Sequence, residues 1–127
     1  MLEEEITRIP RLRNIGRALA EFSLSQFPGL QLQGDSQGRF VSRPHNFVTF
    51  KVHWKRAENI TITLRGNPQE FPTLPELELK SDQHGYSSCK VTKAAELAAA
   101  ALYIRRAAEL YREGRQRDQR RQRLVDK

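Results

Sequence analysis

The sequence predicts an α+β domain in which N- and C-terminal helices pack on one face of an antiparallel β-meander of four to five strands. Three observations predict it: helical periodicity before residue 28, strict alternation in residues 46–65, and an alanine-rich helical segment after residue 92. A chain of 127 residues has the size of one core. We therefore expect a single domain over residues 1–113, followed by a basic tail or helix extension over residues 114–127.

The first helix is predicted by apolar residues spaced three and four apart. A proline at position 10 suits the first turn of a helix, and Pro28 with Gly29 stops it. The apolar positions that define this amphipathic helix are Leu12, Ile15, Leu19 and Phe22.

Two hairpins are expected to follow. In the first, the turn residues GDSQG at 34–38 separate a short extended segment from Phe40 and Val41. In the second, residues 56–59 can make the turn, and the alternating apolar residues on both sides of it are typical of half-buried strands. The apolar face must be covered, whereas the polar face can remain wet. The apolar set of the second hairpin is Val48, Phe50, Val52, Trp54, Ile60, Ile62 and Leu64.

Residues 66–85 contain three prolines and little periodicity, so we expect a long surface connection there. The segment YSSCKV at 86–91 then predicts a short strand, and Thr92 is a plausible N-cap for a helix over residues 93–113. The expected helical stripe is Leu97, Ala101, Ile104, Ala108 and Tyr111. Leu97 and Ile104 should pack with Leu19 and Phe22 against the sheet.

Several kinds of site are not expected. Cys89 is the single cysteine, which excludes an internal disulfide and favours a packed residue over a nucleophile. The histidines His45, His53 and His84 lack the close spacing of zinc ligands. No glycine-rich phosphate loop or nucleophile elbow is present in the sequence. We therefore expect no metal, no cofactor and no enzymatic activity.

Neither a membrane-spanning stretch nor a secretory signal is apparent in the sequence. No window reaches roughly 18 consecutive apolar residues, and the first residues, MLEEEITRIP, are acidic where a signal peptide is basic. We expect a cytoplasmic protein without a membrane partner.

The positive charge is concentrated near the C-terminus. The net charge is +7, and residues 112–127 hold seven basic and three acidic residues. Such a segment suits a polyanion, although a solvated helix end has the same composition. The predicted nucleic-acid-binding residues are Lys51, Lys55 and Arg65 on the polar face of the second hairpin and Arg115, Arg117, Arg120, Arg121 and Arg123 in the tail. Phe40 and Phe47 are expected to be able to join this face, whose alternative role is an ordinary solvated surface.

Two segments also carry a family resemblance. HNFVTFKVHWKRAENITITLRGNP and HGYSSCKVTKAAELAAAALYIRRAAELYRE resemble a small uncharacterised prokaryotic α+β domain labelled a predicted transport protein. The resemblance covers residues 44–113 and rests on the order of strands, variable loop and closing helix. It implies an accessory module, because members of that family often occur beside nuclease or DNA-modification domains.

Three functions are consistent with these observations. The first is a non-enzymatic accessory module that binds nucleic acid, DNA or RNA, or a nucleic-acid-bound complex through basic residues. The alternative is a protein-interaction or oligomerisation subunit that uses the C-terminal helix through Leu97, Ile104, Leu110 and Tyr111. A third is a metal-dependent nuclease-like enzyme that uses Glu76, Glu78 and Lys80.

Overall fold

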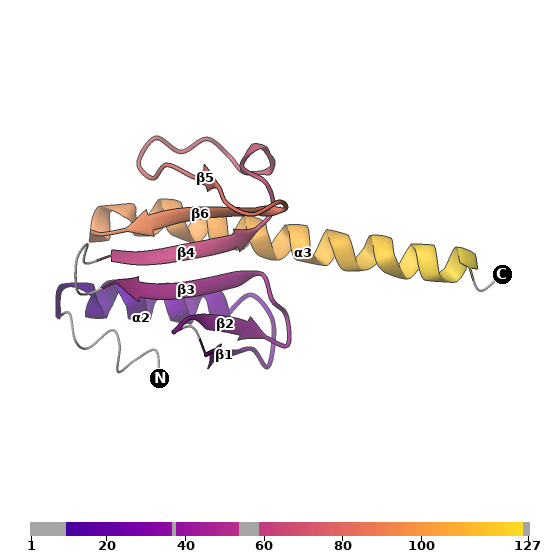
Figure 1. The fold of residues 1–127 in the computed structure, drawn as a ribbon, viewed down its shortest axis with the longest axis horizontal. Coiled ribbons are helices and arrows are strands. Elements are labelled where there is room, and N and C mark those ends of the chain that lie inside the picture. Colours follow the sequence, from indigo (N-terminus) through magenta and orange to yellow (C-terminus); the bar gives the residue numbers. More distant parts are fainter. Residues whose placement is uncertain (1–9, 37, 54–58, 126–127) are drawn as a thin grey trace.

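The computed structural model describes the backbone of residues 10–36, 38–53 and 59–125. It describes the side chains of residues 12–36, 38–53 and 59–114. These residues form two long helices, a six-stranded antiparallel sheet and two short 3-10 helices, η1 and η2 (Figure 1). In chain order the elements are α2 (Pro10–Leu24), β1 (Gln31–Gly34), β2 (Phe40–Arg43), β3 (Val48–His53), β4 (Asn59–Arg65), η1 (Pro68–Glu70), β5 (Lys80–Ser81), β6 (Tyr86–Val91), η2 (Ala94–Glu96) and α3 (Leu97–Val125).

The sheet has the strand order β1-β2-β3-β4-β6-β5. The first four strands form the expected meander, but β6 pairs with β4 and leaves β5 at the edge. The predicted number of four to five strands was therefore too low. Strand β5 has two residues, too few for an alternating pattern, and lies in the connection that was expected to lack regular structure.

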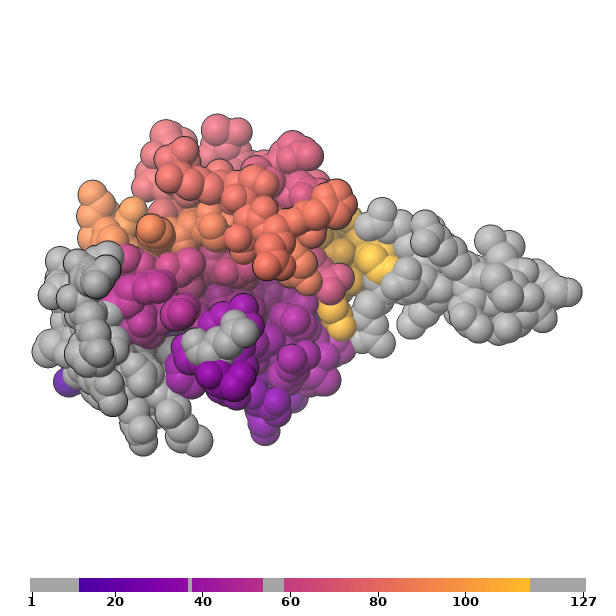
Figure 2. Space-filling view, viewed as in Figure 1, coloured from indigo at the N-terminus to yellow at the C-terminus, as the bar shows by residue number. Residues whose placement is uncertain are grey.

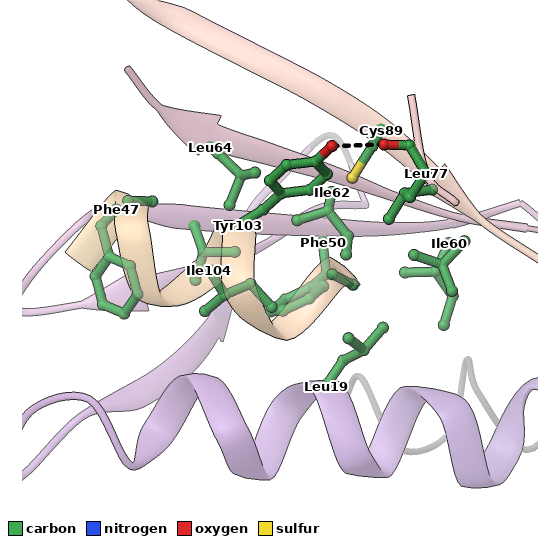
Figure 3. Packing of buried hydrophobic residues seen from close by; sticks show 14 of the residues in the cluster. Leu19, Phe47, Phe50, Ile60, Ile62, Leu64, Leu77, Cys89, Tyr103 and Ile104 are labelled. Atoms are coloured by element: carbon green, nitrogen blue, oxygen red, sulfur yellow. Dashed lines mark hydrogen bonds between the residues drawn. The ribbon is translucent and has the colours of Figure 1, made fainter. Parts of the chain in front are cut away.

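Both helices cover the same face of the sheet and contact each other, as predicted (Figure 1). The register pairs Phe50 with Ile62, and Ile62 with Cys89, so that one row of side chains points into this two-layer core. Figure 3 shows these residues beside Tyr103 and Ile104 of α3. Of the predicted core residues, Leu19, Phe50, Val52, Ile60, Ile62, Leu64 and Ile104 are buried, Phe22 and Leu97 are half-buried, and Trp54 lies outside the described residues.

The ends of the helices differ in how well they were predicted. Helix α2 begins at Pro10, as expected. Helix α3 begins at Leu97 and not directly after Thr92. The carboxylate of Glu96 accepts hydrogen bonds from the Thr92 backbone, the Thr92 hydroxyl and the Lys93 backbone, which holds η2 ahead of α3. Thr92 is therefore not the N-cap of α3, because its hydroxyl donates to Glu96.

Small residues let α3 approach the sheet closely. Its buried alanines are Ala99, Ala100, Ala107 and Ala108. The buried stripe is centred on Tyr103, Ile104 and Ala107, one position away from parts of the predicted stripe. Beyond the sheet the backbone of α3 continues as one helix to Val125 (Figure 1), in line with the expected extension of the last helix into the basic segment.

The connection between β4 and β5 is packed onto the core. Phe71 and Leu77 are buried, and the Tyr103 hydroxyl donates a 2.6 Å hydrogen bond to the Leu77 carbonyl. The connection starts at Gly66, whose φ of +122° is in the region that favours glycine. A Cβ at this position would lie 2.6 Å from Cδ1 of Leu110, so the close approach of connection and helix also requires glycine.

Candidate nucleic-acid interface

The face of the sheet opposite α2 and α3 is polar, and within the described residues no helix covers it (Figure 1). We call this surface the open face; Figure 2 looks onto it. The register places its side chains in cross-strand rows. One row is Lys51–Thr61–Lys90, contributed by β3, β4 and β6. The next row is Thr49–Thr63–Ser88–Lys80, which extends to β5.

These rows combine ammonium groups with hydroxyl groups. Lys51, Lys80 and Lys90 are exposed, whereas the threonines and Ser88 are half-buried between them. Residues opposite each other on neighbouring strands have Cβ atoms about 5 Å apart. Ammonium and hydroxyl donors at this spacing match the oxygens of a phosphate chain, which proteins contact through lysine, serine and threonine.

Lys51 and Lys90 both act on His53 of β3. Burial and the charges of Lys51 and Lys90 lower the pKa of His53 below its ordinary value of 6.5, so His53 is mostly neutral at pH 7. On the β5 side, Lys80 and Lys90 line a small pocket together with Glu78 and Glu96. The charges of Lys51 and Lys90 are therefore felt at the same place on the open face.

Of the predicted binding residues, the structure places Lys51 on the open face. Lys55 lies outside the described residues. The backbone of the arginine-rich tail belongs to α3, and the side chains of Arg115, Arg117, Arg120, Arg121 and Arg123 lie outside the described part. The prediction for the tail thus rests on its sequence and on the helical backbone that carries it.

Phe40 and Phe47 were wrongly expected to be able to join the open face. Phe40 is 7% exposed, because its pairing with Phe50 puts it on the helix-facing side. Phe47 is 1% exposed, and its ring centroid lies 5.4 Å from that of Phe27. Neither ring is available to stack on a ligand at the open face.

Arg65 is also directed elsewhere. Its guanidinium lies 5.4 Å from the ring centroid of Tyr111 in α3, within reach of a cation–π interaction. Arg65 and Phe47 are joined by a backbone hydrogen bond at the end of the β3–β4 pair. Both side chains therefore leave the open face at the same end of the hairpin and join an aromatic cluster beside α3.

We call this group the end cluster, and its members are Phe27, His45, Phe47, Arg65, Tyr111 and Arg112. The His45 Nδ1 and the Tyr111 hydroxyl are 3.2 Å apart. Arg112 places its guanidinium 4.4 Å from the Phe27 ring centroid and donates a 2.5 Å hydrogen bond to the Gln26 carbonyl. The cluster thus fastens α3 to the segment after α2 at the point where α3 leaves the sheet.

Sequence reasoning missed Lys90 and Tyr86 as residues of the open face. The signal was available, because alternation in YSSCKV separates Tyr86, Ser88 and Lys90 from Ser87, Cys89 and Val91. What the sequence lacked was the pairing of β6 with β4, which places Lys90 in the same row as Lys51.

The apolar surface required by the alternative function is used within the domain. Ile104 and Leu110 are buried, and Leu97 and Tyr111 are half-buried against the core. Among the described residues, the large apolar side chain that α3 exposes is Leu102, at 47%. Ile104 and Leu110 are therefore used within the domain, and Leu97 and Tyr111 are used in part.

The residues of the third function are not assembled into a metal site in the described part of the chain. No group of three or more histidine, cysteine, aspartate or glutamate side chains is close enough to hold a metal ion there. Glu76 and Glu78 are exposed in the connection before β5. Burial, assisted by the charge of Glu96, raises the pKa of the Cys89 thiol to about 12, so Cys89 is a packed thiol as predicted.

Comparisons with known proteins add no assignment. None of the helices in the described ranges has the length and apolar character needed to cross a membrane. No protein-family model, curated protein or solved structure matches the chain, so the resemblance described above stays a prediction.

Proposed function

We propose that the protein is a non-enzymatic nucleic-acid-binding module whose open face contacts the phosphate backbone. The observation that carries the proposal is the Lys51–Thr61–Lys90 row, which presents two cations and a hydroxyl across three neighbouring strands. Burial is the main cause of the lowered pKa of His53, and the charges of Lys51 and Lys90 add to it, which supports the view that both lysines act at one place.

The arginine-rich end of α3 supplies the second part of the proposed interface. The basic residues of this end follow directly after the end cluster in the chain. The end cluster fixes the direction in which α3 leaves the domain. Phosphate contacts from this helix and from the open face both add affinity without reading the base sequence. Each contact releases counterions, so binding should weaken steeply with salt.

The test is fluorescence anisotropy of the full chain with labelled DNA and RNA, single- and double-stranded, across a salt series. A variant with Lys51→Glu and Lys90→Glu should bind about tenfold or more weakly and lower the salt slope by about two. A chain ending at Glu113 should also lose affinity, since the arginine-rich part of α3 is removed.

The matched control is Arg13→Glu with Arg17→Glu, two exposed arginines of α2 in the helix layer. This variant changes the net charge by the same amount on the other side of the sheet, and we expect less than about threefold loss. If both double variants lose affinity equally, the loss comes from the overall charge of the protein and not from the open face. Absence of binding, or binding that does not depend on salt, would refute the proposal.

A second candidate is a protein-interaction subunit, and the part of α3 that extends beyond the sheet favours it (Figure 1). In that case the projecting helix docks on a partner or on a second copy of the chain. Light scattering at high protein concentration tests self-association directly. If the full chain has the mass of a monomer at every concentration, self-association is excluded. If the full chain is a dimer and the chain ending at Glu113 is a monomer, self-association through the projecting helix is supported.

A further inference from the structure

The open face contains a hollow of about 290 Å³ at the end away from the Lys51–Lys90 pair. It lies between the turn that joins β1 to β2 and the turn that joins β5 to β6, on the face seen in Figure 2. Thr49 and Thr63 form the wall that it shares with the rows described above. A volume near 300 Å³ is at the lower end for small-ligand pockets and admits a single flat ring system.

The charges that line this hollow are balanced. Arg39 is paired with Asp35 through a 2.9 Å ion pair, and the Arg39 backbone also donates to the Asp35 carboxylate at 2.9 Å. The other two charges are those of Arg43 and Asp82. The hollow therefore offers no excess positive charge to a phosphate, unlike the Lys51–Lys90 pair, and suits a neutral group that forms hydrogen bonds.

The remaining polar side chains of the hollow are of types that bind flat, neutral rings through hydrogen bonds and stacking. Asn46, Gln83 and Tyr86 line the hollow, and their side chains form no hydrogen bond with any other residue that the structure describes. Each amide offers donors and an acceptor, as the edges of nucleobases do. The Tyr86 ring supplies an aromatic surface, and the nearly buried Val41 adds an apolar one.

The position of the hollow relates it to the phosphate-binding rows. Thr49 and Thr63 are two residues from Lys51 and Thr61 along their strands, a distance of about 7 Å. When a phosphate of the nucleic acid sits between Lys51 and Lys90, a base of the same nucleic-acid strand can therefore reach the hollow. A base can enter only if it is unstacked and unpaired, a state that single strands adopt more readily than a duplex does.

We propose that this hollow receives one unstacked nucleobase, so that the module prefers single-stranded over double-stranded nucleic acid. This inference rests on the proposed function, since the open face must hold the backbone that carries the base. Stacking on Tyr86 and hydrogen bonds to the amides of Asn46 and Gln83 hold the base. The chemistry is common to DNA and RNA.

The experiment compares three labelled ligands of equal length: a single strand, the same strand with abasic sites throughout, and a duplex, in DNA and RNA where each exists. The wild-type chain should bind the single strand about tenfold more tightly than either the abasic strand or the duplex. Wild-type affinity that is equal for the base-bearing and the abasic strand overturns the inference without any variant.

Variants then locate the effect. Tyr86→Val with Gln83→Ala should lose about fivefold to tenfold in affinity for the single strand and remain within twofold for the abasic strand. Tyr86→Phe keeps the ring and should bind like the wild type. The control Gln33→Ala removes an exposed amide from the same face of the sheet outside the hollow and should change neither ligand.

Failure of this inference can be told apart from failure of the proposed function. If the double variant at Tyr86 and Gln83 loses the same affinity for the base-bearing strand and for the abasic strand, the hollow is not the site of the base. If binding in that case remains sensitive to salt and to Lys51→Glu with Lys90→Glu, the phosphate-binding function stands alone. Absence of binding to every ligand refutes both.

Discussion

The Tyr103 hydroxyl donates a 2.6 Å hydrogen bond to the Leu77 carbonyl and thereby ties the connection before β5 to helix α3 (Figure 3). Both residues are buried, so the Leu77 carbonyl relies on this hydroxyl as its partner within the protein. Replacing Tyr103 with phenylalanine leaves that carbonyl unpaired, and we expect a loss of about 1–3 kcal/mol in the free energy of unfolding, measured in urea. Tyr86→Phe, whose hydroxyl has no such partner in the described chain, should stay within about 0.5 kcal/mol. Equal effects would mean that the Leu77 bond adds no stability.

Two fully buried serines should respond differently to substitution by alanine. The Ser42 hydroxyl donates to the His45 carbonyl at 2.6 Å and accepts from the backbone nitrogens of Phe47 and Val48 at 3.2 and 3.4 Å. Ser42→Ala leaves several buried backbone groups without this partner, and we expect a loss of about 2 kcal/mol.

Ser23 is the matched control for Ser42. Its hydroxyl donates at 2.7 Å to the Leu19 carbonyl one turn earlier in α2. That carbonyl already has a helical partner, and alanine favours the helix, so Ser23→Ala should change stability by less than about 0.5 kcal/mol. Thermal unfolding of both variants under one buffer gives the comparison, and a larger loss for Ser23→Ala contradicts it.

The sequence was informative where a pattern repeats over several residues. Alternation over β3 and β4 predicted which of their side chains enter the core, and the register confirms it from Val48 to Val52. At the end of this hairpin the same alternation put Phe47 and Arg65 on the wrong face. There the ends of β3 and β4 border the end cluster, and packing against Phe27 and Tyr111 outweighs alternation.

Relations between distant segments could not be predicted from the pattern alone. Phe40 was misplaced because its side depends on the pairing of β2 with β3, which a strand pattern does not specify. Lys90 and the lining of the hollow were missed for the same reason, since Asn46, Tyr86 and Asp35 are far apart in the chain. The open face is thus a product of strand order, with β6 inserted between β4 and β5.

Cys89 should be unreactive while the domain is folded. The thiol is buried on the helix-facing side of β6, and its pKa of about 12 leaves almost no thiolate at pH 8. We expect labelling by an aromatic disulfide reagent to be slower by two orders of magnitude or more than in denaturant. Rapid labelling in native buffer would show that β6 opens readily. Ser88→Cys, a half-buried neighbour on the open face, provides the positive control.

Binding of nucleic acid should strengthen as the pH falls, because of His53. In the free protein burial and the charges of Lys51 and Lys90 lower its pKa below 6.5, so it is mostly neutral at pH 7. A phosphate between the two lysines offsets their repulsion and raises the pKa of His53 in the complex. The complex then binds more protons than the free chain, and linkage makes affinity rise as the pH drops through the pKa of His53 in the complex. We expect anisotropy titrations to show about threefold to tenfold tighter binding at pH 5.5 than at pH 7.5.

The variants His53→Gln and His84→Gln separate this effect from general titration of the protein. His53→Gln should bind with nearly the same affinity at both pH values, because the group that gains the proton is absent. His84 is exposed in the turn between β5 and β6, away from the Lys51–Lys90 pair, so His84→Gln should keep the full pH dependence. If His53→Gln keeps it as well, the proton is taken up elsewhere, and the phosphate does not lie beside His53. The informative case is the one in which both variants bind like the wild type at pH 7.5. If His53→Gln alone then loses the pH dependence, the phosphate backbone of the ligand lies on the Lys51–Thr61–Lys90 row.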